Sequence, residues 1–257
     1  LINYGGERRL VDFKQHKQVW SQCNADELQA SSFNSVSRHT AFVDGDQLYF
    51  RPADGGKDIQ LTTDGSREIV YGRSVHRDEF GIHSGLFWSP DGMRLAFYRM
   101  DQSMVPSYPQ VDIKSKGAEG DGSRIAETYS CHYPMAGEKS HFVKVGVYDT
   151  ETQKNVWLHL VGEKDDYHTN ISWAPDGKSV VYVSRKKTGM AYALSTNSDL
   201  YQYNLETKET KNLTEGMMGY DTNPRFSKSG RYLAWLSMER DGYESDMNRI
   251  FILDMEN

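Results

Sequence analysis

The chain has 257 residues, of which 26% are charged, and it carries a formal net charge of −6. This length can bury a large core in one or two domains, and the acidic balance argues against a nucleic-acid-binding protein, which would show a basic face. No apolar run approaches the ~20 residues that a membrane-spanning helix needs. The opening stretch, "LINYGGERRLVDF", has neither an initiator Met nor the apolar core of a signal peptide. We therefore expect a piece of a longer protein.

One hairpin pattern returns along the chain. A short strand ends in an aromatic residue, a tight turn follows, and a second strand continues in strict polar–apolar alternation. Pro-Asp-Gly and Lys-Ser-Gly suit such turns, because Pro presets φ and Gly accepts a positive φ. The copies are "SFNSVSRHTAFV" (32–43), "FWSPDGMRLAFYRMD" (87–101), "SWAPDGKSVVYVSR" (172–185) and "RFSKSGRYLAWLSMERDG" (225–242). Their aromatic residues, Phe33, Trp88, Trp173 and Phe226, are spaced 55, 85 and 53 residues apart.

A second phrase accompanies the first and predicts a strand, a polar turn and often another strand. Its copies are "LVDFKQHKQVW" (10–20), "VKVGVYDTETQKNVWL" (143–158), "DLYQYNLETKETKNLT" (199–214) and "RIFILDMEN" (249–257). A third echo pairs "IQLTTDG" (59–65) with "KNLTEG" (211–216). Together the phrases predict about four antiparallel strands per repeating unit.

Repeated four-stranded units of this size are the signature of propeller blades. One blade cannot bury both faces of its sheet, so blades stack around a centre. We therefore predict an all-β protein, a β-propeller of four-stranded antiparallel blades. Residues 1–257 form a single propeller domain in this interpretation, with roughly four to five blades of a propeller that has seven or eight.

The longest interval between copies indicates an insertion. The stretch between Trp88 and Trp173 holds one blade and about 40 further residues, at 102–142. Within it lies "KSKGAEGDGSR" (114–124), which is Gly-rich and polar, so we expect a mobile loop there.

Known catalytic motifs are missing from the sequence. It contains no G-x-S-x-G nucleophile elbow, no H-E-x-x-H pair and no C-x-x-C pair. We therefore expect no catalytic residue, no metal site and no cofactor in this chain. Cys23 and Cys131 are too few for a disulfide framework and are expected as free thiols or one incidental bridge.

Two stretches stand apart from the repeat. The first, "VHRDEFGIHSG" (75–85), holds the adjacent acids Asp78 and Glu79 just before the Trp88 hairpin. They fit a solvated charged turn, or a clamp for a cation such as a free α-amino group, because an ammonium offers three donors and no acceptor. The second, "YSCHYPMAGEKSHFVKVGVYD" (129–149), is too specific for a generic blade, although its composition indicates no chemistry.

These stretches carry a resemblance to a known family. "VHRDEFGIHSGLFWSPDGMRLAFYRMDQSMVPSYPQVD", followed by "YPMAGEKSHFVKVGVYD", resembles the N-terminal β-propeller of dipeptidyl peptidase IV-type enzymes of the prolyl oligopeptidase family, most of all the bacterial members. The similarity is strong over about 70–185, looser over 186–257 and weak before residue 33.

The resemblance implies a function for the acidic pair. Members release N-terminal dipeptides, typically X-Pro or X-Ala, and a short acidic segment of the propeller binds the free amino group of the peptide. Asp78 and Glu79 match that segment if the alignment takes a single-residue gap, with Asp in place of the first Glu, and Glu79 is the stronger candidate. A propeller Arg near the substrate carbonyl is also implied, but the sequence does not identify it.

The resemblance also implies partners. The propeller caps a C-terminal α/β-hydrolase domain that carries Ser, Asp and His. That domain is absent from this chain, which should be inactive alone. Peptides with a free N-terminus are the expected substrates, a homodimer is a further expectation, and neither nucleic acid nor a membrane is an expected partner. The expected location is the periplasm or cell surface of a bacterium.

Two other classes remain open. TolB-like periplasmic propellers share the "SPDG" phrase and act as protein-interaction modules without catalysis. A propeller glycosidase would need two separated carboxylates in a pocket, whereas Asp78 and Glu79 are neighbours in the chain.

Overall fold

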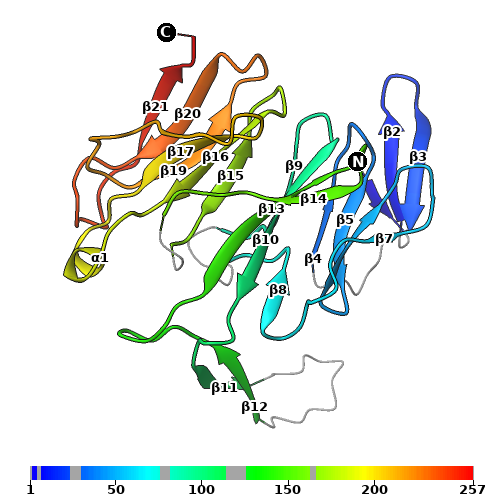
Figure 1. Cartoon of the computed structure of the whole chain (residues 1–257). Helices are drawn as coiled ribbons and strands as arrows, with labels where there is room; N and C mark the ends of the chain where they lie inside the picture. The colour runs from blue at the N-terminus through cyan, green and yellow to red at the C-terminus, as the bar shows by residue number, and fades with distance from the viewer. Residues whose placement is uncertain are drawn as a thin grey trace.

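In a computed structural model, the protein is built almost wholly of antiparallel sheets. The structure describes residues 2–4, 7–23, 30–75, 82–113, 126–162 and 166–256. Within these ranges the helix α1 (Met190–Leu194) is the only α-helix, and Figure 1 shows the sheets side by side in chain order. The prediction of an all-β protein is confirmed.

The first sheets follow the chain from its N-terminal end. A three-stranded sheet, β1-β2-β3, comes first, with the bounds β1 (Ile2–Tyr4), β2 (Glu7–Asp12) and β3 (Lys17–Cys23). The first blade is the four-stranded sheet β4-β5-β6-β7, with the bounds β4 (Ala30–Phe33), β5 (Thr40–Asp44), β6 (Gln47–Arg51) and β7 (Ile59–Gln60).

The second blade is the largest sheet. Its order is β14-β13-β10-β8, and β9 also pairs with β10. The bounds are β8 (Ile69–Tyr71), β9 (Leu86–Trp88), β10 (Arg94–Asp101), β13 (Phe142–Asp149) and β14 (Lys154–Trp157).

The third and fourth blades are simpler. The third has the order β15-β16-β17-β18, with the bounds β15 (Thr169–Trp173), β16 (Ser179–Ser184), β17 (Asp199–Asn204) and β18 (Thr210–Asn212). The fourth shows three strands, β19 (Asp221–Phe226), β20 (Tyr232–Ser237) and β21 (Arg249–Asp254).

The apolar core lies between neighbouring blades, as a propeller requires. One cluster joins Phe50 of the first blade to Phe97 of the second. A second cluster joins Tyr98 of the second blade to Tyr182 of the third, and a third joins Val181 of the third blade to Leu233 of the fourth. Each sheet between two others thus buries both faces, which confirms the predicted stacking of four-stranded antiparallel blades.

The repeated phrases form the same turn each time. In the turns after Trp88, Trp173 and Phe226, the glycine N–H donates to the carbonyl oxygen three residues earlier, at 2.8, 2.9 and 3.0 Å. These glycines, Gly92, Gly177 and Gly230, have φ values of 72°, 66° and 78°, a region that L side chains rarely adopt. The predicted Pro-Asp-Gly and Lys-Ser-Gly turns are therefore confirmed.

The third sequence echo corresponds to a shared side-chain bond. Thr62 of "LTTDG" accepts a hydrogen bond from the Leu48 N–H at 2.9 Å, and Thr214 of "NLTEG" accepts one from the Leu200 N–H at 3.0 Å. All four groups are buried. The threonine satisfies a strand N–H where the last strand of the blade is too short to do so.

The insertion predicted at 102–142 lies between β10 and β13. It is not a loop throughout: β11 (Ser107–Ile113) and β12 (Ala126–His132) pair as a separate two-stranded ribbon, which extends away from the blades in Figure 1. The Gly-rich stretch 114–124 lies outside the described residues.

Candidate functional site

The second blade has a break in its edge strand, and the site is built around it. β8 pairs with residues 99–101 of β10, and β9 pairs with residues 95–97 of the same strand. Between them the chain leaves the sheet after Gly72 and returns at Gly85. The Gly72 N–H donates to the Tyr98 carbonyl oxygen at 3.0 Å, and the Tyr98 N–H donates to the Gly85 carbonyl oxygen at 3.0 Å. Residues 73–84 are therefore an excursion whose two ends meet opposite one residue.

Glycine is required at both ends of this excursion. Gly72 has a φ of 63°, in the left-handed region. A Cβ atom on Gly85 would lie 2.3 Å from the Arg73 carbonyl oxygen and 2.4 Å from the Gly72 carbonyl carbon. Backbone atoms cannot move away as a side chain can, so no other residue fits there without displacing the excursion.

A hydrogen bond ties the outgoing and returning chains together above the glycines. The buried Ser74 hydroxyl donates to the Ile82 carbonyl oxygen. Val75 and Ile82 are both buried, Val75 completely. The excursion therefore has a fixed base as far as residues 75 and 82.

Asp78 and Glu79 belong to this excursion by sequence. Residues 76–81 lie outside the described residues, so the structure gives no position for either carboxylate. The residues on both sides are described: Ser74 and His83 line one cavity, and Ile82 lines another. The assignment of the pair to amine binding stays a prediction.

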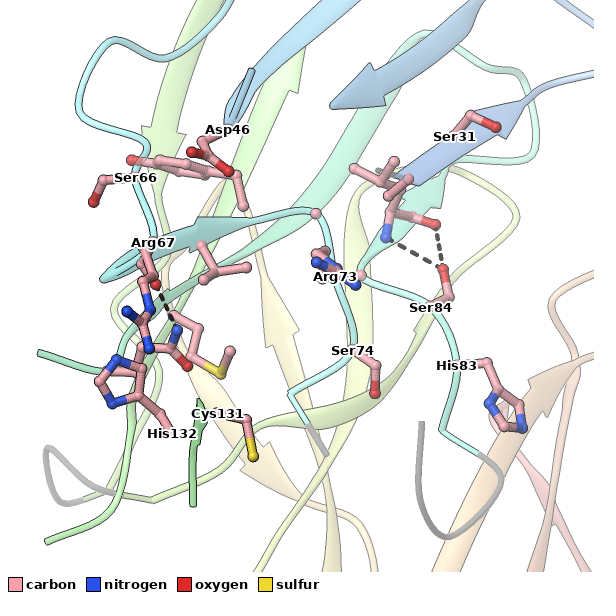
Figure 2. Close-up of a pocket in the computed structure, with 18 of the residues that line it drawn as sticks. Ser31, Asp46, Ser66, Arg67, Arg73, Ser74, His83, Ser84, Cys131 and His132 are labelled. Carbon is pink, nitrogen blue, oxygen red and sulfur yellow. Dashed lines mark hydrogen bonds between the residues drawn. The ribbon is translucent and has the colours of Figure 1, made fainter. Parts of the chain in front are cut away.

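The first cavity, with a volume of about 680 Å³, lies beside the excursion (Figure 2). Several separate stretches of chain line it, among them β4 with Ser31, the turn before β8 with Arg67, the excursion with Arg73 and His83, and β12 with Cys131. Two arginines and two histidines line it, against the single described carboxylate of Asp46. Among the described lining residues, cationic and hydroxyl groups therefore outnumber acids.

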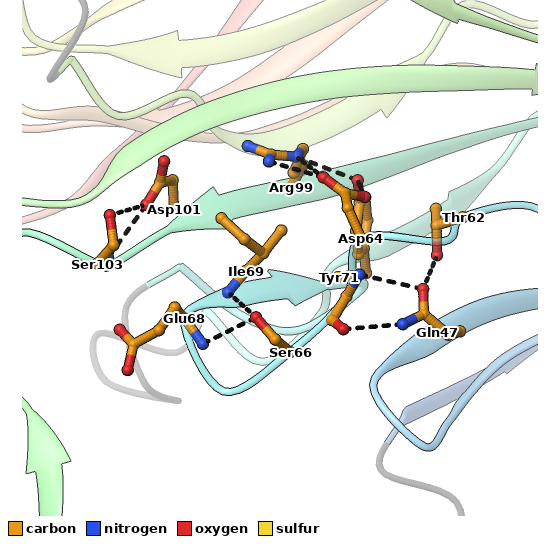
Figure 3. Close-up of polar contacts among 11 residues, drawn as sticks. Gln47, Thr62, Asp64, Ser66, Glu68, Ile69, Tyr71, Arg99, Asp101 and Ser103 are labelled. Atoms are coloured by element: carbon orange, nitrogen blue, oxygen red, sulfur yellow. Dashed lines mark hydrogen bonds and ion pairs between the residues drawn. The ribbon is translucent and has the colours of Figure 1, made fainter.

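A polar network fixes the wall behind the cavity (Figure 3). The Tyr71 hydroxyl donates to the Asp64 carboxylate at 2.7 Å, and the Arg99 guanidinium donates to the same carboxylate at 2.8 Å. Burial, and then the hydrogen bond to Asp64, raise the pKa of Tyr71 to about 12. Burial opposes ionisation of Asp64, but the bonds from Arg99 and Tyr71 outweigh it and lower the pKa of that carboxyl. The network thus holds an ionised acid and a neutral phenol at neutral pH.

Further hydrogen bonds hold the turn that carries Arg67. The Gln47 side-chain amide donates to the Gly65 carbonyl oxygen at 2.8 Å and accepts from the Gly65 N–H at 3.1 Å. The Ser66 hydroxyl accepts from the N–H groups of Glu68 and Ile69, at 3.2 and 3.1 Å. Arg67 is therefore presented by a turn with little freedom.

The ribbon β11–β12 closes the opposite side of the cavity. His132 Nδ1 lies 2.7 Å from the Val105 carbonyl oxygen, and its Nε2 lies 3.0 Å from the Glu68 carboxylate. Arg67 donates to the Ser130 hydroxyl at 2.9 Å. These contacts attach the inserted ribbon to the second blade and place the free thiol of Cys131 in the lining.

A second cavity, of about 1050 Å³, is lined by the helix α1 and by residues in or beside the second, third and fourth blades. It receives Ile82 from the excursion and Tyr167, Val183 and Tyr220 from the blades. The "YPMAGEK" stretch, which sequence reasoning left without a role, contributes Pro134, Met135 and Glu138. The residues after Tyr129 thus line both cavities, Cys131 and His132 the first and Pro134 onward the second.

The sequence singled out the acidic pair, which lies outside the described residues, and did not indicate the residues that line the first cavity. Arg67, Arg73, His83 and His132 meet only because strands far apart in the chain come together. No group of His, Cys, Asp or Glu among the described residues could hold a metal ion. Within the same residues, no helix is long and apolar enough to cross a membrane.

Comparison with known proteins places this geometry in a family. The family model described as "Dipeptidyl peptidase IV (DPP IV) N-terminal region" matches residues 3–257. Dipeptidyl-peptidase 5 of Porphyromonas gingivalis is 63% identical over 86 residues, which are 34% of this chain and 13% of that protein. Probable dipeptidyl-aminopeptidase B of Phaeosphaeria nodorum is 34% identical over 162 residues, 59% of this chain and 18% of that protein.

Solved structures agree with the sequence matches. A putative dipeptidyl aminopeptidase IV from Bacteroides ovatus superposes with a TM-score of 0.73 and 31% identity, over 99% of this chain and 33% of that chain. Porphyromonas gingivalis dipeptidyl peptidase 4 gives a TM-score of 0.70 over 100% of this chain and 36% of its own, and at 20% identity it shows the fold alone. The chain thus spans about a third of the length of these two solved chains, and its matches cover less than a fifth of the two sequence relatives. It belongs to the family of dipeptidyl peptidase IV N-terminal regions.

Proposed function

We propose that this chain is the substrate-recognising part of a dipeptidyl peptidase. In the longer protein, a C-terminal α/β-hydrolase domain supplies the Ser, Asp and His of catalysis, and the propeller selects peptides with a free N-terminus. The chain itself holds no catalytic residue and requires no cofactor in this proposal. Family membership and the relatives' printed activities support it.

The observation that carries the proposal is the pinched excursion of the second blade. A solvated charged turn needs no fixed base, yet this one is held by Gly72, Gly85 and the bond from Ser74 to Ile82. The described residues at its two ends line two cavities, Ser74 and His83 the first and Ile82 the second. A fixed base under a short acidic segment suits recognition of a charged group.

The proposed chemistry is an ammonium held by the carboxylates of Glu79 and Asp78. An ammonium presents three donors, and charge-assisted hydrogen bonds to carboxylates are short and strong. Fixing the amine fixes the distance along the peptide, so the cut falls after the second residue, typically Pro or Ala. A blocked amine is rejected because it would leave the acids unpaired.

The proposal is tested in the full-length protein with Glu79→Gln and Asp78→Asn. We expect kcat/KM for X-Pro and X-Ala substrates to fall by about 100-fold for Glu79→Gln and less for Asp78→Asn, since losing a bond to a charged group costs roughly 1.5–3 kcal/mol. The matched control is Glu206→Gln, an exposed acid on the β17–β18 turn that pairs with Lys178 at 3.1 Å. Unchanged kinetics for both acidic-pair variants would remove the amine clamp. Absence of any peptidase activity in the full-length protein would favour an interaction module.

A further inference from the structure

The ribbon β11–β12 extends away from the blades (Figure 1) and has no assigned role. A two-stranded ribbon is only marginally stable by itself in water, because a single pairing leaves most of its surface exposed. Large side chains on it are exposed accordingly: Val111 to 60%, Tyr129 to 51% and Tyr108 to 45%. The ribbon therefore offers backbone edges and side chains that suit pairing with a further segment.

The hydrogen-bond register shows which backbone groups of the ribbon face outward. Tyr133, directly after β12, donates its N–H to the carbonyl oxygen of the residue opposite it at 3.0 Å. In an antiparallel ladder every second pair exchanges such bonds, and the pairs between them do not. By this register, Pro109 and Val111 of β11 point their backbone groups away from β12. Ser130 and Thr128 of β12 point theirs away from β11 in the same way.

The two edges of the ribbon differ in what they offer. Pro109 has no N–H, and a proline at an outward position blocks the pairing of a further strand with β11. β12 contains neither Pro nor Lys in its seven residues. In the first three blades, by comparison, the outermost strands β7, β14 and β18 have two, four and three residues. β12 therefore provides a longer and unblocked edge.

The outward edge of β12 begins at the first cavity. Ser130, Cys131 and His132 line that cavity, and the Ser130 carbonyl oxygen accepts a hydrogen bond from Arg67 at 3.3 Å. Further along the strand, the outward N–H and C=O groups of Thr128 form no hydrogen bond with any described residue. An extended chain that leaves the cavity past Arg67 would therefore meet unpaired backbone groups of β12.

We propose that the outward edge of β12 binds an extended peptide as an additional β-strand. The choice of a peptide as the occupant rests on the proposed function, in which the protein takes up peptides. Main-chain hydrogen bonds to Thr128 and Ala126 supply the affinity, so binding depends little on the peptide's side chains. It requires a peptide N–H at every second residue. Extended peptides without proline at those positions are therefore the preferred class.

The test measures binding of a peptide of about ten residues to the full-length protein by fluorescence anisotropy. The peptide is labelled at its C-terminus and acetylated at its N-terminus, so an amine clamp adds nothing to its affinity. A series of such peptides carries one backbone N-methyl group each, at successive positions. We expect Kd to rise about five- to tenfold at every second position of the paired stretch, where a hydrogen bond is lost, and to change less than about twofold between them.

A pair of proline variants identifies the edge. Thr128→Pro removes an outward N–H from β12 and breaks no bond between β11 and β12. It should raise Kd of the unmethylated peptide about tenfold. Val111→Pro makes the same change on the opposite edge of the ribbon, beside Pro109, and is the matched control. It should leave Kd within about twofold.

Three results would overturn the inference. The first is no binding, or a Kd that does not alternate along the N-methyl series. The second is equal weakening by Thr128→Pro and Val111→Pro, which would mean damage to the ribbon. The third is a dimer in sedimentation that Thr128→Pro dissociates, which would mean that a second copy occupies the edge.

Failure of the proposed function itself looks different. In that case free-amine and N-acetyl dipeptide anilides would be cleaved equally or not at all, while the acetylated peptide would still bind with the alternating pattern. A protein that cleaves only free-amine anilides and shows no alternation would lose this inference alone.

Discussion

The second and third blades share one hairpin phrase in the sequence but differ in the strands that surround that hairpin. In both, a tryptophan that closes the first hairpin strand donates to the preceding blade: Trp88 to the Ser32 carbonyl oxygen at 3.2 Å, and Trp173 to the Phe87 carbonyl oxygen at 2.9 Å. The third blade has a single strand in that place, β15, whose pairing with β16 shifts register only between Thr169 and Ser172. The second blade splits that strand into β8 and β9 and adds the ribbon β11–β12.

The difference teaches where function lies in a repeated fold. The parts that repeat, namely turns, tryptophan bonds and interblade cores, build a scaffold that would serve any propeller. The parts that depart from the repeat supply described residues to the lining of the first cavity, namely 73–74 and 83–84 of the excursion and 130–132 of the ribbon. Substitutions in the excursion and substitutions in the repeated scaffold should therefore have separable effects.

The largest effect on stability is expected at the base of the excursion. Gly85→Ala places a methyl group 2.3 Å from the Arg73 carbonyl oxygen, and backbone must shift to admit it. We expect the free energy of unfolding to fall by about 3 kcal/mol. Urea denaturation followed by tryptophan fluorescence measures this.

The control for that substitution is Gly56→Ala in the first blade. There the nearest atom to the added Cβ is the Asp54 carboxylate at 3.0 Å, a flexible side chain that can move. Its cost should stay below about 1 kcal/mol. Equal costs at the two glycines would contradict the close approach described for the second blade.

The third blade should show its own pH dependence through His168, which is 5% exposed. Burial, and then the charge of Lys186, lower the pKa of His168 to about 4, against opposing effects of the Val161 carbonyl and Asp166. The unfolded chain therefore binds a proton at a higher pH than the folded protein does. Stability should fall as the pH drops from about 6.5 to about 4, by up to about 3 kcal/mol, and then level off.

His168→Phe removes this titration while keeping a ring against Tyr182, where the two ring centroids lie 5.3 Å apart. Unfolding free energies of the variant and the unmodified protein, measured at half-unit pH steps, give the comparison. We expect the difference between them to change with pH only within that window. A constant difference from pH 7 to pH 4 would show that another group titrates.

The smallest effect on stability is expected from the two tryptophans that bond to the preceding blade. It tests whether these two repeated bonds are equivalent. Trp88→Phe and Trp173→Phe each remove one hydrogen bond between neighbouring blades. We expect each to lower the free energy of unfolding by about 1–2 kcal/mol, from the lost bond and the unpaired carbonyl group. A loss in only one of the two would mean that the repeated bonds are not equivalent.

The sequence predicted the parts of the fold that local chemistry determines. The turns at Gly92, Gly177 and Gly230 follow from residues with known φ preferences, and the blades follow from the returning phrase. The ribbon β11–β12 was missed, because its strands are separated by the Gly-rich stretch and one of them contains Pro109. Pairing across such a stretch depends on contacts that composition does not reveal.

Asp78 and Glu79 stand out in the sequence because they are adjacent acids in an unusual phrase, and their assignment to amine binding stays a prediction. The described lining of the first cavity could not be predicted in this way. Arg67 and His132 are 65 residues apart in the chain and meet through the bond from Arg67 to Ser130 and the pair of Glu68 with His132. No pattern in the sequence brings those stretches together before the blade is formed.

The central claim is that the excursion of the second blade, and not the repeated scaffold, recognises the peptide amine. Its most direct test replaces residues 73–84 of the full-length protein with a short glycine linker, which is feasible because Gly72 and Gly85 are already in contact. The measurement is the ratio of kcat/KM for a free-amine Ala-Pro anilide to that of its N-acetyl form. We predict a ratio that falls by at least about 100-fold towards one, with an unchanged circular dichroism spectrum. A shortened protein that still prefers the free amine as strongly as before would contradict the account.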